Sequence, residues 1–156
     1  MTVEIERRFL LADDSWREAA SELLVLQQGY LSVEKERTIR VRIIGSQAWL
    51  TLKGYISDMT RSEFEYEIPL AHAQAMMADM CPFKMEKYRY RVEFEGFVYE
   101  IDEYFGDNAP LIVAEIELPS EDTEFPKPSW LGKEITADGK FTNAYLSKHP
   151  YSSWTE

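Results

Sequence analysis

Pairs of like-charged residues two positions apart are the feature of this 156-residue sequence that could do chemistry. The carboxylate pairs include Glu4 with Glu6 and Glu115 with Glu117, and the basic pairs include Arg40 with Arg42. In a strand, residues two positions apart point to the same side of the backbone. Each pair is therefore unfavourable unless a ligand of opposite charge lies beside it.

The two kinds of pair bind complementary ligands. Paired carboxylates supply the hard oxygen ligands that suit Mg²⁺ or Mn²⁺, whereas paired guanidinium groups grip phosphate oxygens. A ligand that needs both is a metal-bound polyphosphate. Phosphoryl transfer asks a protein mainly for positioning, in-line geometry and compensation of charge. Arginine, lysine and carboxylate side chains that cluster in one site are therefore sufficient to catalyse this reaction.

Alternation of charged and apolar residues predicts that strands position these pairs. We expect eight strands, at residues 3–11, 25–33, 38–44, 48–55, 61–70, 83–95, 97–105 and 111–118. We expect helices from about residue 15 to 24, over residues 71–80 and over residues 142–148, with a loop from residue 119 to the last helix. Short connections favour a mainly β (α+β) fold, a closed eight-stranded antiparallel barrel, because an open sheet of this size leaves edges exposed.

The alternation separates a charged face from an apolar face, and periodicity alone leaves two interpretations open. In one, the charged face is the outside of a barrel filled with apolar side chains. In the other, it lines an interior that binds a ligand. The alternation alone favours the first. Composition weakens that preference, because a solvent-facing surface normally mixes Thr, Ser, Gln, Asn and Lys, whereas these positions are nearly all arginine or carboxylate.

Composition also excludes several classes of protein. The formal net charge of -11 argues against a nucleic-acid binder, which needs clustered basic residues. Cys81 is the only cysteine, so no internal disulfide forms and a reducing compartment fits best. The first residues do not show the pattern of a secretory leader, and no apolar run approaches about 18 residues. We therefore expect one cytoplasmic domain over residues 1–156, with no membrane partner. His72 and His149 are the only histidines, which disfavours a Ser-His-Asp triad or a histidine-ligated zinc.

Residues 4–8, Glu-Ile-Glu-Arg-Arg, resemble the N-terminal Glu-x-Glu-x-Lys strand of the CYTH superfamily, the triphosphate tunnel metalloenzymes. Further segments resemble the family's other strands in the same order: Arg-x-Arg at 40–42, Leu-Thr-x-Lys at 50–53, Arg-x-Glu-x-Glu at 61–65, Lys-x-Arg at 87–89, Asp102, and Glu-x-Glu at 115–117. Residues 130–136 resemble the closing segment of short bacterial members. Each motif is weak by itself, but seven in order make a specific pattern.

The resemblance implies an eight-stranded antiparallel barrel whose charged residues face inward and form a tunnel. The apolar residues then face outward and need a cover from helices or from a second subunit, so a homodimer is an expected assembly. The implied triphosphate-binding residues are Arg8, Arg40, Arg42, Lys53, Arg61, Lys87 and Arg89, of which Arg8 and Lys87 are implied to be catalytic. The implied ligands of Mg²⁺ or Mn²⁺ are Glu4, Glu6, Glu63, Glu65, Asp102, Glu115 and Glu117.

Several activities occur in this family, and the short chain favours inorganic tripolyphosphatase because it has no inserted segment for a base or a thiazolium. The alternatives are a nucleoside, RNA or thiamine triphosphatase, or an adenylate cyclase using the same tunnel. Arg8 stands where the family has lysine. A guanidinium keeps the positive charge but stays protonated, so a direct general-base role is disfavoured here. A non-catalytic polyphosphate-binding module is therefore a further alternative.

Overall fold

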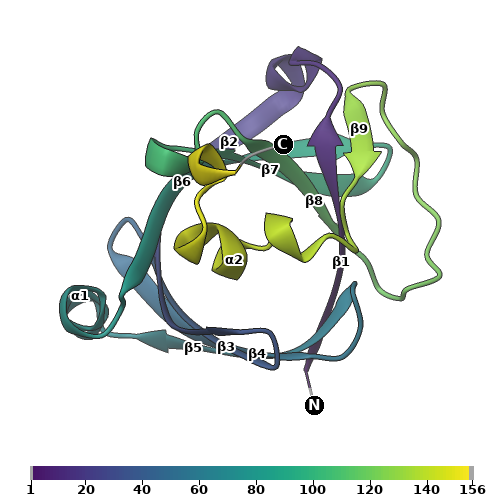
Figure 1. The fold of residues 1–156 in the computed structure, drawn as a ribbon. Coiled ribbons are helices and arrows are strands. Elements are labelled where there is room, and N and C mark those ends of the chain that lie inside the picture. Colours follow the sequence, from purple (N-terminus) through teal and green to yellow (C-terminus); the bar gives the residue numbers. More distant parts are fainter. Residues whose placement is uncertain (1, 155–156) are drawn as a thin grey trace.

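Nine strands form a single antiparallel sheet in the computed structural model, which describes residues 2–154 (Figure 1). They are β1 (Val3–Leu11), β2 (Ala20–Glu34), β3 (Arg37–Ile44), β4 (Gln47–Tyr55), β5 (Thr60–Ile68), β6 (Phe83–Phe94), β7 (Phe97–Tyr104), β8 (Ile112–Glu117) and β9 (Leu131–Glu134). The order is β5-β4-β3-β2-β6-β7-β8-β1-β9, and β1 also pairs with β5. That pairing closes β1 to β8 into a ring, so the predicted eight-stranded barrel is confirmed.

Two α-helices occur within residues 2–154, α1 (Leu70–Asp79) and α2 (Asn143–Lys148). Short 3-10 helices accompany them: η1 (Ser15–Ala19), η2 (Gly106–Asn108), η3 (Gly139–Phe141) and η4 (Tyr151–Ser153). α1 lies outside the ring of strands, whereas α2 lies within it (Figure 1). None of the helices in the described range is long and apolar enough to span a membrane.

The N-terminal helix predicted to reach residue 24 is wrong. Only η1 is helical, and β2 begins at Ala20 and runs for 15 residues. Leu23 and Leu24 lie opposite Tyr90 and Arg89 of β6. The local helix propensity of this Ala- and Glu-containing stretch is weaker than the gain from extending the ladder with β6.

The prediction of an unbroken loop after residue 119 is also wrong, because β9 lies within it. β9 pairs with the end of β1, where Phe9 faces Glu134 and Leu11 faces Leu131. Gly132 permits this approach, because a Cβ there would lie 2.8 Å from the carbonyl oxygen of Leu10. Four residues containing a glycine give too short a pattern to be recognised as a strand.

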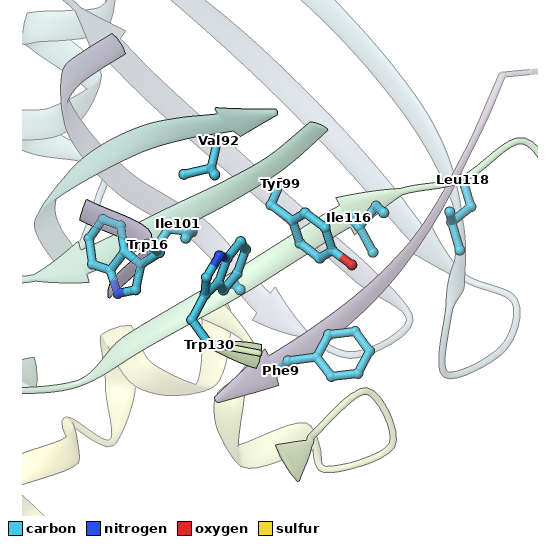
Figure 2. Packing of buried hydrophobic residues seen from close by; sticks show 9 residues of the cluster. Phe9, Trp16, Val92, Tyr99, Ile101, Ile116, Leu118 and Trp130 are labelled. Carbon is cyan, nitrogen blue, oxygen red and sulfur yellow. The ribbon is translucent and has the colours of Figure 1, made fainter. Parts of the chain in front are cut away.

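Most of the apolar core lies outside the barrel wall. Figure 2 shows the largest cluster, which is made of outward-facing residues of β1, β6, β7 and β8 together with Trp16 and Trp130. Trp16, Tyr99 and Ile101 are fully buried there. A second outer cluster packs α1 against Val41 and Ala48 of the barrel. The apolar face therefore points outward, as the resemblance implied, and η1, α1 and residues 118–131 cover much of it.

One end of the barrel interior is filled with apolar side chains. Leu10, Met85, Tyr104 and Val113 project inward, and they pack with Leu146 of α2 and with neighbouring residues of the C-terminal segment. Each of these four strand residues lies two positions from a charged residue of the interior, so the same strand faces continue from apolar to charged. The interior is therefore a one-ended cavity, closed at the α2 end.

Candidate active site

A cavity of about 640 Å³ occupies the charged part of the barrel interior. Six of the predicted site residues line it: Glu4, Glu6, Arg8, Arg40, Lys53 and Arg61. Its wall also includes Lys35 and Asp58, from the turns after β2 and β4, and Asn143 and Tyr145 of α2. The charged strand faces thus meet around one space, with the strand turns at its mouth and α2 at its inner end.

Carboxylates gather on the β1 and β8 side of this cavity. The antiparallel register places Glu6 opposite Glu117 and Arg8 opposite Glu115. The Lys53 Nζ atom lies 2.7 Å from Glu4 Oε1 and 3.6 Å from Glu63 Oε2. Burial raises the pKa of Glu4, but the ion pair with Lys53 outweighs it, so the pKa is lowered overall. The Glu4 carboxylate therefore favours the ionised form at neutral pH.

Glu6 is in the opposite electrostatic situation. Burial, followed by repulsion from Glu115 and Glu4, raises its pKa to about 8, and Lys53 and Arg8 offset only part of this effect. Burial raises the pKa of Glu117 as well, and Glu4 adds to that rise. This side of the cavity therefore holds more carboxylate than its neighbouring cations neutralise, which is the charge balance that a divalent cation would correct.

Basic residues gather on the β6 side. The Lys87 Nζ atom donates a hydrogen bond of 2.7 Å to Asp102 Oδ2, and both side chains are completely buried. Arg89 Nε and Nη2 donate to the two oxygens of the same carboxylate at 2.8 and 3.0 Å. Burial lowers the pKa of Lys87 to about 7 although Asp102 opposes the change. Burial opposes ionisation of Asp102, but Arg89 and Lys87 outweigh it and hold its pKa well below the ordinary value.

Arg8 and Arg40 bring guanidinium groups to the cavity wall. Arg8 Nη2 donates to the backbone carbonyl of Phe141, and Arg8 Nε lies 3.6 Å from Glu115 Oε1. Arg40 Nη2 lies 3.4 Å from Thr51 Oγ1 and 3.7 Å from Glu65 Oε2. Each side chain keeps a buried Nε donor with no hydrogen-bond acceptor among residues 2–154. Such donors are costly to bury unless a ligand supplies acceptors.

The other predicted residues lie behind or beside the cavity wall. Arg42 donates from Nε to Gln28 Oε1 at 2.7 Å, and Lys87, Arg89, Asp102 and Glu115 form the buried ion-pair network. Glu63 and Glu65 lie on β5 opposite Lys53 and Thr51. Within the described range, no three acidic, histidine or cysteine residues converge closely enough to enclose a metal ion by themselves. Asp102 in particular already accepts three hydrogen bonds from its two cationic partners.

Two neutral residues of the site, Gln28 and Asn143, were not predicted from the sequence. Gln28 is fully buried, and its Nε2 atom has no acceptor among the described residues. Asn143 lines the cavity from α2 and bonds to Lys87. Neither amide belongs to a charged pair, so the charge pattern does not indicate them. The sequence around Asn143 did predict a helix beginning near Thr142. The Thr142 side-chain oxygen caps this helix by accepting a hydrogen bond from the Tyr145 amide.

The fold and the site together define a closed antiparallel barrel with a charged interior cavity. The CYTH domain family model matches residues 2–145, and the chain belongs to this family. An inorganic triphosphatase of Acetivibrio thermocellus is 40% identical over 157 residues, covering all of both chains. An inorganic triphosphatase of Nitrosomonas europaea is 31% identical over 148 residues, covering 92% of this chain and 96% of that protein.

Solved structures agree with this assignment. The crystal structure of an inorganic triphosphatase superimposes with a TM-score of 0.65 at 31% identity, covering 92% of this chain and 97% of that one. A Hippeastrum protein, described as a putative adenylyl cyclase with a dominant triphosphatase activity, gives a TM-score of 0.58 at 15% identity, covering 77% and 80%. The second likeness extends to the fold alone.

Proposed function

We propose that this protein hydrolyses inorganic tripolyphosphate to pyrophosphate and phosphate with the help of Mg²⁺ or Mn²⁺. The observation that carries the proposal is the cavity itself, in which a carboxylate-rich side faces guanidinium groups with unpaired buried donors. A metal-bound polyphosphate satisfies both sides at once. The full-length similarity to two inorganic triphosphatases supports the same substrate.

The carboxylates present fit a magnesium-type ion. Mg²⁺ is usually held by one or two carboxylates, with the remaining positions filled by water and substrate phosphates, so a closed protein cage is not required. Glu4 and Glu6 would hold the ion with help from Glu117, and Glu63 and Glu65 flank a second position. When bound, such an ion neutralises phosphate charge and makes a coordinated water more acidic.

The chain's basic residues would bind and orient the triphosphate. Arg8, Arg40, Lys53 and Arg61 line the cavity directly. Arg42, Lys87 and Arg89 lie behind this layer, where Gln28 and Asp102 fix their directions. Fixed donors that already face the phosphate oxygens stabilise developing charge without reorganisation. The closed inner end would limit how far the chain of phosphates enters.

A substrate panel tests the proposal. Phosphate release is measured from tripolyphosphate, thiamine triphosphate and ATP with Mg²⁺, with Mn²⁺ and with excess chelator, and cyclic AMP is measured with ATP. We expect tripolyphosphate to be hydrolysed fastest and chelator to abolish turnover. Glu4→Ala should also abolish turnover while the protein stays folded, whereas the exposed-surface control Glu22→Ala should behave as the unchanged protein. Cyclic AMP formation, full activity in chelator, or binding without turnover would each reject the proposal.

We also propose that a second copy of the chain covers an exposed apolar patch on the barrel wall. Leu52 of β4 lies opposite Phe64 of β5, and Phe64 and Tyr66 are 42% and 58% exposed. Outward-facing aromatic residues in one patch favour association. Phe64→Glu should convert a dimer into a monomer by light scattering, and the control Ala19→Glu should not. A monomeric unchanged protein would reject this assembly.

We also propose a cytoplasmic location, because the free thiol of Cys81 fits a reducing compartment.

A further inference from the structure

Asn143 occupies the boundary between the apolar closure of the barrel and the charged cavity. It is the first residue of α2 and lines the cavity. Its Oδ1 atom accepts a hydrogen bond of 2.5 Å from the Tyr104 hydroxyl and one of 3.3 Å from Lys87 Nζ. Lys87 and Tyr104 are both essentially fully buried. Two rigid groups therefore fix one end of this amide.

The two contacts determine which way the amide faces. A lysine ammonium has three donors and no acceptor, so the atom that faces Lys87 must be the amide oxygen. An amide oxygen has two lone pairs, and Lys87 and Tyr104 engage both. The Nδ2 group must then point away from these partners. No residue in the range 2–154 accepts a hydrogen bond from it, although it offers two donors.

The surroundings of Nδ2 call for an acceptor-rich ligand. Arg8 reaches the same C-terminal segment, where its guanidinium donates to the Phe141 carbonyl. Arg8 and Lys87 are donors only, so they offer nothing to a neighbouring N–H group. Phosphate oxygens accept from several donors at once. A phosphate at the inner end of the cavity would therefore complete the hydrogen bonding of Arg8 and Asn143, which both line it.

We propose that Asn143 is a further triphosphate-binding residue, donating from Nδ2 to an oxygen of the innermost phosphate. This inference rests on the proposed triphosphatase function. Asn143 has a second, positioning effect, because its oxygen and Asp102 together engage two of the three N–H groups of Lys87. The third N–H group of Lys87 has no acceptor among residues 2–154. The amide thus supplies one donor directly and orients another without adding charge.

Two substitutions separate the donor role from the positioning role. Asn143→Asp keeps an oxygen for Lys87 and Tyr104 but replaces the donor with a negatively charged acceptor. Asn143→Ala removes both functions. The matched control is Ser147→Ala, also in α2, whose hydroxyl bonds to the backbone of Ala144. The readouts are kcat and KM for tripolyphosphate with Mg²⁺, with thermal unfolding recorded for every variant.

If Nδ2 binds phosphate, kcat/KM should fall roughly tenfold in Asn143→Ala and roughly a hundredfold or more in Asn143→Asp, with Ser147→Ala unchanged. A purely positioning or structural role predicts the reverse order, in which Asn143→Asp retains most of the activity. That order would overturn the inference while leaving the triphosphatase proposal intact. If the unchanged protein releases no phosphate from tripolyphosphate, the proposed function itself fails.

Discussion

The stability of the metal-free protein should depend on pH through Glu6, and Glu6→Gln isolates this dependence. The pKa of Glu6 is raised from 4.5 to about 8 by burial and by the nearby carboxylates. Between these pH values the folded chain keeps the proton whereas the unfolded chain has released it. Raising the pH across this range therefore favours unfolding, and the free energy of unfolding falls until about pH 8 and then levels off.

The size of the effect follows from the same pKa. A tenfold change in an acid constant corresponds to about 1.4 kcal/mol, so the full movement of the Glu6 pKa corresponds to roughly 5 kcal/mol. Glu6 is not completely buried, so water screens its repulsion from Glu115 and Glu4. This screening reduces the penalty, and we expect on the order of 2 kcal/mol. A glutamine cannot ionise and should not show this loss.

Urea unfolding in chelator at pH 5, 7 and 9 measures the prediction. Relative to the unchanged protein, Glu6→Gln should gain about 2 kcal/mol between pH 5 and pH 9. Titrating groups far from Glu6 are common to both proteins and cancel in this difference. Glu22→Gln, at an exposed position of β2, is the matched control and should show no gain. A difference between Glu6→Gln and the unchanged protein that stays constant with pH would refute the reasoning.

Three further predictions concern other parts of the molecule. Arg8→Lys should change turnover by about tenfold or less, because several donors share the phosphate; a hundredfold gain in a phosphate-release assay would show that arginine impairs catalysis. Asp102→Ala should destabilise the protein by about 3–5 kcal/mol in urea unfolding, because it leaves Lys87 buried without its carboxylate; a loss below about 1 kcal/mol would contradict this. Gly132→Ala should lower stability by about 1–3 kcal/mol because its new Cβ would meet the β1 backbone, while Gly139→Ala, which meets nothing, serves as the control.

The barrel and the direction of its faces were predictable for different reasons. The eight strands that form the barrel follow from alternation, and seven of them lie within a few residues of their predicted bounds. The inward direction of the charges came from the family resemblance, which the CYTH match confirms. The error before Leu24 arose because a short amphipathic stretch fits either structure until its partner strand is known, and here β6 decides.

The site was predictable where it depends on charge and unpredictable where it depends on tertiary contact. Pairing of like charges indicated Glu4, Glu6 and Arg40 of the cavity wall, and the family resemblance added Arg8, Lys53 and Arg61. All six remain predicted ligands. The charge pattern did not reveal that Asp102 forms ion pairs with Lys87 and Arg89, because these three residues meet across two strands. The charge pattern also missed Asn143, because its amide is neutral. The inner end of the cavity was therefore not predictable from the sequence.

Arg8 stands where the family has lysine, and in the structure it makes a contact that the sequence did not predict. In the sequence, arginine replaces a lysine and raises the question of whether a base has been lost. In the structure, its guanidinium reaches the carbonyl of Phe141, which lies 133 residues away in the chain. Its backbone also receives support from Thr136, whose hydroxyl accepts from the Arg8 amide at 3.0 Å. A single ammonium group has fewer donors and a different geometry, so it would not contact both the Phe141 carbonyl and the phosphate that we propose for this cavity. Arg8 therefore links the wall of the cavity to its closed end, where Asn143 also lies. The effects on turnover of substituting Arg8 and of substituting Asn143 should therefore be compared in the same assay.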